Sequence, residues 1–315
     1  MSFDTLLGND RLKQNLAESL AKNHISHFYL ISGPRGSGRK TLATLLAQAI
    51  LCQGHRKPCG TCEPCRKIQN KNHPDFITVE DPEHKNVAVK IVRAFREDVF
   101  IRPNESDYKI YLFPQDLGVE GQNALLKILE EPPKYGIFLL LTDNPEKILP
   151  TVRSRCTELK MQALSQETLQ TYLCARFPET AREDIAAAAL RSGGFLGQAL
   201  ELLESGGAVP PQTEGFINAV SSRNHLLLTQ TLVPMEKWKR EALSDLLQSW
   251  LELTEEALAA RSGRPALSPH ARVLSQSRTP AELLHLNSCL KKAADYTMSN
   301  VSPAAVCGWL SWALR

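Results

Sequence analysis

The stretch HFYLISGPRGSGRKT (residues 27–41) joins a short apolar run to a glycine-rich loop and then to a segment with apolar residues at helical spacing. A short apolar run that is bounded by glycine is typical of a buried strand. A strand, a glycine loop and a helix in this order are the context of a phosphate-binding loop, whose backbone amides face phosphate at the helix N-terminus. The stretch therefore predicts an α/β domain built around such a loop.

The loop departs from the functional pattern, which is Gly, four residues, then Gly-Lys-Ser/Thr. The candidate nucleotide-binding residues are the three glycines and the three residues that follow them: Gly33, Gly36, Gly38, Arg39, Lys40 and Thr41. Arg39 occupies the lysine position and Lys40 the hydroxyl position, so Thr41 comes one residue late. An arginine is a larger, planar group than a lysine, and no hydroxyl follows it to bind magnesium.

A second apolar run, KIYLFPQD (109–116), also departs from the ATPase pattern. ATPases of this kind place acidic residues after such a strand to hold magnesium and orient water. Here Pro114 and Gln115 stand at those positions, and Asp116 comes two residues late. Two independent defects predict a structural relic without ATP hydrolysis. Weak nucleotide binding and an intact site with a shifted register remain as alternatives.

Four of the eight cysteines fall in one short segment: Cys52, Cys59, Cys62 and Cys65. Their spacing, C-x6-C-x2-C-x2-C, predicts one tetrahedral zinc site that is structural, because four thiolates leave no position for a catalytic water. Two disulfides or four free thiols are the alternatives. The other cysteines are expected to serve packing: Cys156, Cys174, Cys289 and Cys307.

The composition sets bounds on location and class. The chain has 315 residues, a formal net charge of +3 and 43% hydrophobic residues. No apolar run reaches 18 residues, so we expect no membrane span. The N-terminus lacks the basic and apolar regions of a secretory signal, and a cytoplasmic protein is expected. The net charge is too small to indicate nucleic-acid binding by itself.

Strand-like runs alternate with helical segments up to about residue 160, which predicts a largely parallel sheet. Further strands are expected at DFITVE (75–80), KIYLFP (109–114) and IFLLLT (137–142). Beyond that point the pattern is helical. GAVPPQT (207–213) is predicted to be a linker, and breaks are expected near residues 262–269 and 277–280.

Two motifs, QNALLKILEEPP (122–133) and TVRSRC (151–156), together with the cysteine insert, resemble the AAA+ clamp-loader subunits of bacterial DNA polymerase III, the delta-prime type most of all. The resemblance covers residues 1 to about 205 and extends more loosely through the C-terminus. It implies an AAA+ α/β domain over 1–162 with a zinc-binding insert, a helical lid over 163–207 and an all-α oligomerisation domain, the collar, over 208–315.

The resemblance also implies an activity and partners. It places the chain in the DNA polymerase III holoenzyme, a DNA-directed DNA polymerase complex, as a subunit that helps to load the sliding clamp on primed DNA. The implied partners are the gamma/tau and delta subunits in a hetero-oligomer. No intrinsic ATPase activity is expected. The alternative is an active gamma/tau-like AAA+ ATPase of DNA replication or repair, which ATP turnover by the isolated chain would reveal.

The family uses the arginine of its SRC motif, here Ser154, Arg155 and Cys156, as a finger that reaches the ATP site of a neighbouring subunit. The resemblance implies that role for Arg155, in trans, while Arg153 faces elsewhere. Without the resemblance, a surface ion pair of Arg155 with Glu130 or Glu131 is the simpler interpretation. A further nucleotide-contacting arginine of the family is replaced here by Gly197, and Arg191 lies a turn or more away.

Overall fold

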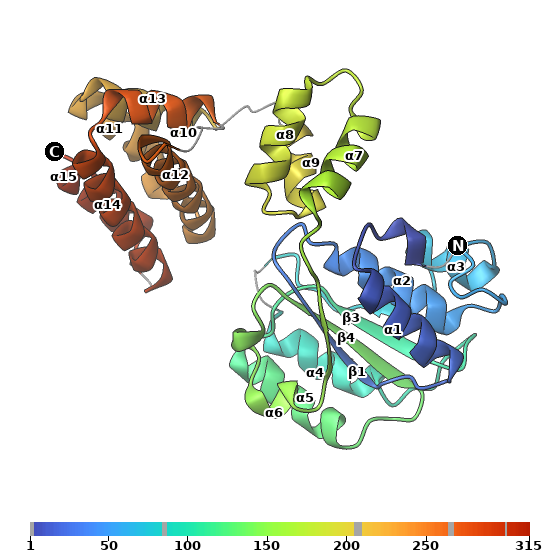
Figure 1. Cartoon of the computed structure of the whole chain (residues 1–315). Helices are drawn as coiled ribbons and strands as arrows, with labels where there is room; N and C mark the ends of the chain where they lie inside the picture. Colours follow the sequence, from blue (N-terminus) through green and yellow to red (C-terminus); the bar gives the residue numbers. More distant parts are fainter. Residues whose placement is uncertain (1–2, 84–86, 205–209, 264–267, 300) are drawn as a thin grey trace. The chain divides into compact units, whose positions relative to one another are not determined.

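The computed structural model describes residues 3–83, 87–204, 210–263, 268–299 and 301–315. The chain divides into two compact units, Met1–Leu202 and Leu203–Arg315, each with its own core. Figure 1 shows the sheet and its helices in the first unit and helices alone in the second. Within the described residues, no helix is both long and apolar enough to cross a membrane.

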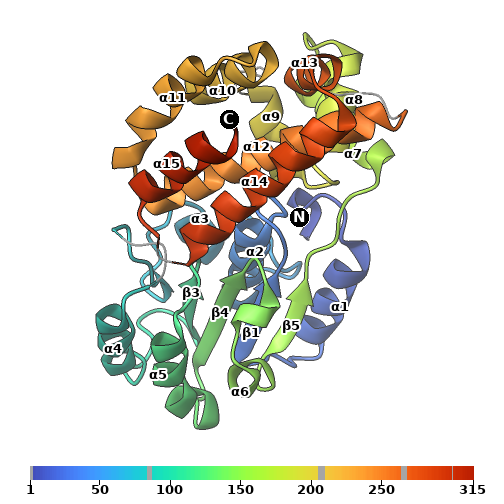
Figure 2. The same ribbon diagram turned by 90° about the vertical axis from the view of Figure 1, so that its left-hand side faces the viewer.

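The first unit contains one five-stranded parallel sheet with the order β2-β3-β4-β1-β5 (Figure 2). Its strands are β1 (Phe28–Ser32), β2 (Phe76–Thr78), β3 (Lys109–Phe113), β4 (Gly136–Thr142) and β5 (Thr157–Lys160). Every residue of β1, β3 and β4 is buried, as expected for strands covered on both faces. The predicted parallel α/β class is confirmed.

Helices cover both faces of the sheet (Figure 1). The helical elements of this region are η1 (Phe3–Thr5), α1 (Asp10–Ala21), α2 (Arg39–Leu51), α3 (Glu63–Gln69), α4 (Val89–Asp98), α5 (Val119–Glu130), η2 (Pro145–Lys147) and α6 (Pro150–Arg153). Successive strand residues point to opposite faces. Ile31 packs in the cluster of α1 and α2, whereas Leu30 packs in the cluster of α4 and α5.

Three short helices complete the first unit: α7 (Gln166–Arg176), α8 (Arg182–Arg191) and α9 (Leu196–Glu204). The Ser165 hydroxyl accepts a hydrogen bond from the amide of Thr168 and caps α7. Gly193 and Gly194, both with positive φ, separate α8 from α9. The predicted boundary between lid and collar, at 207/208, lies outside the described residues, and the three-part division stays a prediction.

The second unit is entirely helical in its described residues. Its elements are α10 (Pro211–Ser222), α11 (His225–Leu232), η3 (Val233–Lys237), α12 (Arg240–Arg261), α13 (Pro269–Ser277), α14 (Pro280–Met298) and α15 (Pro303–Ala313). The predicted breaks near 262–269 and 277–280 are confirmed. The predicted linker is wrong in its last residues, because Pro211 starts α10 at a position where proline suits a helix.

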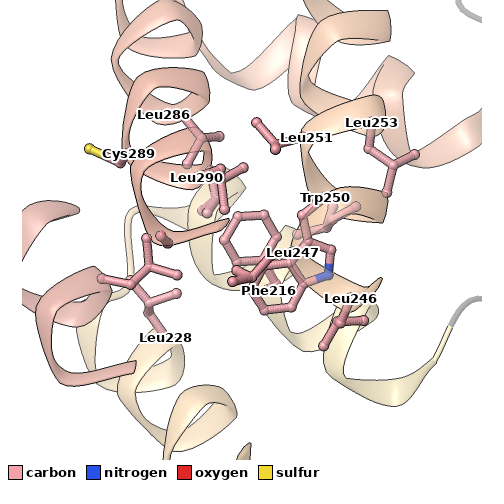
Figure 3. Close-up of a cluster of buried hydrophobic side chains, with 14 of the residues drawn as sticks. Phe216, Leu228, Leu246, Leu247, Trp250, Leu251, Leu253, Leu286, Cys289 and Leu290 are labelled. Carbon is pink, nitrogen blue, oxygen red and sulfur yellow. The ribbon is translucent and has the colours of Figure 1, made fainter. Parts of the chain in front are cut away.

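Trp250 of α12 is the centre of this helical core (Figure 3). Its ring stacks on Phe216 of α10 with 3.9 Å between centroids. Its indole N–H donates to the hydroxyl of Thr213 at 3.0 Å, so the buried polar atom is satisfied. Leucines from α12 and α14 surround the pair. The arrangement ties α10, α12 and α14 together around one aromatic contact.

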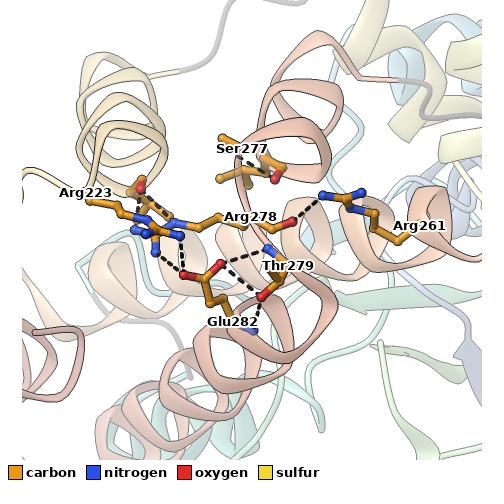
Figure 4. A network of polar contacts seen from close by, with 8 residues as sticks. Arg223, Arg261, Ser277, Arg278, Thr279 and Glu282 are labelled. Atoms are coloured by element: carbon orange, nitrogen blue, oxygen red, sulfur yellow. Dashed lines mark hydrogen bonds and ion pairs between the residues drawn. The ribbon is translucent and has the colours of Figure 1, made fainter.

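A charged network joins α10, α13 and α14 at the surface of the same unit (Figure 4). Glu282 pairs with Arg223 at 2.7 Å and with Arg278 at 3.1 Å, and it accepts the amide of Thr279 at 2.8 Å in a capping box. The backbone hydrogen bond from Thr279 comes first among the contacts that lower the pKa of Glu282 to about 2, followed by the Thr279 hydroxyl and the two arginines.

This lowered pKa predicts a pH-dependent contribution to stability. Because the pKa falls on folding, the contribution of Glu282 is present above its ordinary value of 4.5 and is lost as the pH falls toward about 2. Glu282→Gln should therefore melt below the wild type at neutral pH, with a difference that shrinks across this window. Calorimetric melting against pH measures it, and a difference that does not change with pH would contradict the assignment.

Candidate functional site

The glycine-rich loop runs from the end of β1 to the start of α2. Gly36 and Gly38 have φ angles of 77° and 90°, a region that favours glycine, and Gly38 is the residue directly before the helix. The helix begins at Arg39, which is half-buried, while Lys40 and Thr41 are exposed. The loop thus has the outline of a phosphate cradle, and Arg39 stands at its lysine position.

The loop is in direct contact with α9. The amide of Gly197 donates to the carbonyl of Gly36 at 2.9 Å, and the side-chain amide of Gln198 donates to the carbonyl of Arg35 at 2.9 Å. Arg35 also pairs with Glu201 at 3.2 Å. A Cβ atom on Gly197 would lie 2.6 Å from Cα of Gly36, so the contact requires glycine. Gly197, which the sequence analysis placed where the family has an arginine, therefore serves a backbone contact.

A cavity of about 500 Å³ lies beside the loop. It is lined by loop residues, including Arg39 and Lys40, and by apolar side chains such as Leu6, Leu164 and Phe195. Its size is within the usual range of small-molecule sites. Its lining is a mixture of charged and apolar side chains, including Glu201.

The end of β3 carries no carboxylate at the two positions where the ATPase pattern has them. Pro114 follows the strand, and the side chain of Gln115 is engaged elsewhere. Its carbonyl oxygen accepts the amide of Asp81 at 2.7 Å, and its N–H donates to the carbonyl of Asp81 at 2.9 Å. Gln115 thus fastens the end of β3 to a neighbouring loop in the manner of a backbone pair.

The SRC motif follows the short helix α6. Ser154 caps that helix, and the side chain of Arg155 is 40% exposed. Arg155 donates to the carbonyl of Thr151 at 2.8 Å and lies 3.5 Å from a carboxylate oxygen of Glu130. The surface ion pair considered from the sequence is therefore present, though long. It leaves the guanidinium at the surface.

The two other side chains of this turn behave differently. Arg153 pairs with Glu146 at 3.2 Å and with Glu158 at 3.1 Å, so it points to other partners than Arg155 does. Cys156 is half-buried, and burial raises the pKa of its thiol to about 11. A protonated thiol suits packing and not nucleophilic chemistry.

Gln122 of α5, which the sequence analysis did not single out, holds the segment before α6. Its side chain is 1% exposed and makes three hydrogen bonds. It donates to the carbonyls of Leu117 at 2.8 Å and Lys147 at 3.0 Å, and it accepts the amide of Leu149 at 2.7 Å. Leu149 is the N-cap of α6, so Gln122 fixes the start of the helix that ends at the SRC turn.

The four clustered cysteines converge, as their spacing predicted. The Sγ atoms of Cys52, Cys59, Cys62 and Cys65 all lie within 4.8 Å of one another. Cys52 ends α2, Cys62 precedes α3, and Cys65 lies within α3. Amide groups point at the sulfurs: the amide of Cys62 donates to Cys59 at 3.2 Å, and the amide of Cys59 donates to Cys52 at 3.3 Å.

The chemistry of this set fits a soft metal ion. The amides of Cys62 and Thr61 lower the pKa of Cys59 to about 5, which favours the thiolate that a metal requires. An all-sulfur set of four within this distance can hold a metal such as zinc. Cys289 and Cys307 are buried as predicted, but Cys174 is exposed, and its predicted packing role is wrong.

Comparison with known proteins identifies the family. The family model described as "DNA polymerase III, delta subunit" matches residues 8–165, which is half of the chain. The chain belongs to the DNA polymerase III delta subunit family. The matched residues include the glycine loop, the cysteine cluster and the SRC turn.

Individual proteins of known name align with part of this chain. It is 33% identical to the DNA polymerase III subunit gamma/tau of Mycobacterium tuberculosis over 200 residues, which are 61% of this chain and 35% of that protein. It is 33% identical to the subunit delta' of Bacillus subtilis over 166 residues, 52% of this chain and 50% of that protein. The aligned region thus spans a third to a half of these relatives.

One solved structure is similar in fold to nearly the whole of this chain. The crystal structure of a DNA polymerase III gamma subunit-related protein from Thermotoga maritima covers 96% of this chain, and 99% of that chain is covered. The TM-score is 0.51 at 16% sequence identity. At this identity the likeness concerns the fold alone, an AAA+ type α/β sheet followed by helices.

The contact between Gly36 and Gly197 generates a prediction for this delta-family chain. Gly197→Ala should destabilise the first unit by about 1–3 kcal/mol, because the new methyl group would overlap the loop backbone. Gly308→Ala is the matched control, since Gly308 is also helical but has nothing within 4 Å of a Cβ atom. That change should be neutral or stabilising. Equal melting of Gly197→Ala and wild type in calorimetry would show that the loop and α9 are not in contact.

Proposed function

We propose that this chain is a non-hydrolysing, delta-prime-type subunit of the DNA polymerase III clamp loader. Membership of the delta subunit family supports the assignment to the DNA polymerase III complex. The observation that carries the non-hydrolysing role is the end of β3, where Pro114 offers no ligand and Gln115 is hydrogen-bonded to the backbone of Asp81. The chain would act with gamma/tau and delta subunits in loading a sliding clamp on primed DNA.

The chemistry of phosphoryl transfer explains why these replacements matter. Magnesium is held in such sites by oxygen ligands, and the phosphates are held by a lysine at the loop. Here Arg39 stands at the lysine position, Lys40 replaces the hydroxyl residue that should follow, and the strand end supplies no carboxylate at the two expected positions. The loop retains the fold of a phosphate cradle without the groups that activate water.

We propose that Arg155 acts in trans on the ATP site of a neighbouring subunit. Its exposure and its long ion pair with Glu130 support this role, because such a pair costs little to break at a protein surface. The fixed start of α6 also supports it, since a finger must be held in position to contact a phosphate. A finger stabilises the charge that develops on the transferred phosphate.

An active gamma/tau-like ATPase is the second candidate, and one observation favours it. The gamma/tau relatives align over 200 residues at the same identity, 33%, as the delta' relative does over 166. The two functions differ in what the isolated chain does with MgATP. Magnesium-dependent turnover by the pure chain, abolished by Lys40→Ala, would favour the second candidate and a shifted loop register.

The finger predicts a specific defect in the assembled complex. Arg155→Ala should leave folding and assembly with gamma/tau and delta subunits intact, and it should lower DNA- and clamp-stimulated ATP turnover and clamp loading. Fingers contribute about 10³–10⁵ in rate, and a complex limited by conformational steps would show a smaller loss. Arg155→Lys should rescue poorly, because an ammonium lacks the planar fork.

Arg153→Ala is the matched control, two residues away and paired with Glu146 and Glu158. It should reduce clamp loading less than Arg155→Ala does. Loading is measured at saturating and at limiting ATP, so that a defect that appears only at low ATP is also detected. Wild-type loading by Arg155→Ala under both conditions would leave Arg155 as a surface ion pair.

We further propose that the four cysteines hold one structural zinc ion. Four thiolates complete a tetrahedral shell, so the ion would supply stability and no catalytic water position. The purified chain should contain about one zinc. Cys62→Ser should lose the metal and increase hydrogen exchange in residues 50–70 more than elsewhere. Cys174→Ser, at an exposed cysteine, is the control. Protein that is purified under reducing conditions and shows no metal by elemental analysis would contradict the proposal.

A further inference from the structure

A cavity of about 520 Å³ lies within the second unit. Residues of α10, α11 and α14 line it, together with the end of α15 and the two residues that follow that helix. Its volume is within the usual range of binding sites. The described residues that line it include none of the glycine loop, the cysteine cluster or the SRC turn, so the cavity is a feature of its own.

The buried part of the lining is apolar. Ala219 and Val220 of α10, Leu228 of α11 and Leu286 of α14 are all buried, and they belong to the same core as Trp250. Core side chains are close-packed and fixed in position, so this apolar surface is formed before a ligand arrives. An apolar group that enters the cavity leaves water, which favours its binding.

The exposed part of the lining is cationic. Arg223 and Arg315 are exposed, and the side chain of Arg223 is 64% exposed. Arg278 is the third arginine of the lining, and Glu282 is the one acidic side chain among its described residues. Three arginines and one glutamate give these side chains a formal charge of +2 when the histidines are neutral. The cavity therefore favours an anionic ligand.

The hydrogen bonds of the charged network show which groups remain for a ligand (Figure 4). Oε1 of Glu282 accepts from Arg223 and Arg278, and Oε2 accepts from the amide and the hydroxyl of Thr279. A carboxylate has about four acceptor sites, so Glu282 is saturated. Arg278 also donates twice to the carbonyl of Val220. Arg223 uses only Nη2 among the described residues, so its guanidinium keeps donors for a further acceptor.

Two histidines hold the end of α15 beside the cavity. Nε2 of His225 lies 2.6 Å from the carbonyl oxygen of Ser311, and Nε2 of His285 lies 3.2 Å from that of Ala313. A carbonyl oxygen can only accept, so each Nε2 carries the proton and donates it. These two bonds fix the last turn of the helix and, with it, the place where Arg315 joins the lining.

We propose that this cavity is a docking site for an acidic peptide segment of a partner protein, which inserts one apolar side chain and places carboxylates against Arg223 and Arg315. A buried apolar floor with a charged, exposed rim is the arrangement of a protein interface. In such interfaces a pocket that receives one anchor side chain contributes much of the binding energy. The planar fork of a guanidinium matches a carboxylate.

The exposure of the cations favours a peptide over a free small molecule. Small-molecule sites enclose most of the ligand and its polar contacts. Here the arginines that keep donors lie at the surface, where a longer partner can reach them while its anchor side chain fills the cavity. The inference goes beyond the proposed function and does not depend on it.

Fluorescence anisotropy with the full chain tests the proposal through three matched probes. The first is a fluorescein-labelled, amidated peptide of the sequence Glu-Glu-Leu-Phe. The second, Lys-Lys-Leu-Phe, reverses the charges, and the third, Glu-Glu-Ser-Ser, removes the apolar side chains. The wild type should bind the first probe at least about tenfold more tightly than either of the others. This binding should weaken as salt is added, because exposed charges are screened.

Two variants test the apolar and the cationic part of the cavity separately. Ala281 is an exposed lining residue of α14, so Ala281→Trp places a large ring at the cavity without changing a buried side chain. Arg315→Glu reverses a charge of the rim. Each variant should weaken binding of the first probe by about tenfold.

Lys291→Glu is the matched control, because Lys291 is an exposed cation of the same helix, is not among the lining residues and gives the same change in net charge as Arg315→Glu. Its affinity for the first probe should stay near that of the wild type. Melting temperatures near that of the wild type are expected for all three variants, since each changes an exposed residue.

Three results would overturn the proposal. The first is no binding of Glu-Glu-Leu-Phe by the folded wild type up to about 1 mM. The second is equal binding of the three probes, or an equal loss of binding in Lys291→Glu and Arg315→Glu, which would show attraction by net charge alone. The third is a dimer in analytical ultracentrifugation that Ala281→Trp dissociates, which would assign the cavity to a second copy of this chain. The comparison of probes needs no variant, so it decides the matter even if a variant does not fold.

Discussion

The burial of helix α2 is the constraint on which the first unit depends. The helix is buried at nine of its residues, eight of them apolar, so apolar packing against the central strands sets most of its position. The glycine loop leads directly into its first turn. Cys52, the first of the four clustered cysteines, directly follows its last turn. Gln48, near the same end, donates to the carbonyl of Cys65 at 3.0 Å. One packed helix therefore joins the glycine loop to the cysteine cluster.

Around that helix, several polar groups are paired within the protein. The carbonyl of Gly36 in the loop is paired with the amide of Gly197, Gln115 is paired with Asp81, and Lys147 neutralises Asp116 and Asp143. Buried polar groups need partners, and here the chain supplies them itself. This architecture is compatible with the non-hydrolysing role that we propose. That combination suits a subunit that offers a surface arginine to a neighbour, as we propose for Arg155.

Local signals in the sequence were sufficient for the fold and for the cysteine cluster. The apolar runs of β1, β3 and β4 and the glycine loop identify a parallel sheet, and the Cys-x2-Cys spacing brings sulfurs together within a few residues. Strand β5 was missed because Thr157–Lys160 is an edge strand with one buried side chain, Leu159. Cys174 was misjudged because an apolar helical neighbourhood does not say which face is covered. The pairing of Lys147 with Asp116 could not be predicted, since it joins residues 31 positions apart through the order of strands in the sheet.

The central claim is that the loop has the shape of a phosphate cradle but does not hold MgATP. Hydrogen–deuterium exchange of the backbone amides in residues 33–42, followed by mass spectrometry with and without MgATP, tests it most directly. The account predicts that these amides exchange at the same rate in both conditions, because a loop edge without a hydroxyl at residue 40 or carboxylates at residues 114 and 115 lacks the groups that hold magnesium at the phosphates. Strong additional protection of this segment by MgATP, removed by chelation of magnesium, would contradict it.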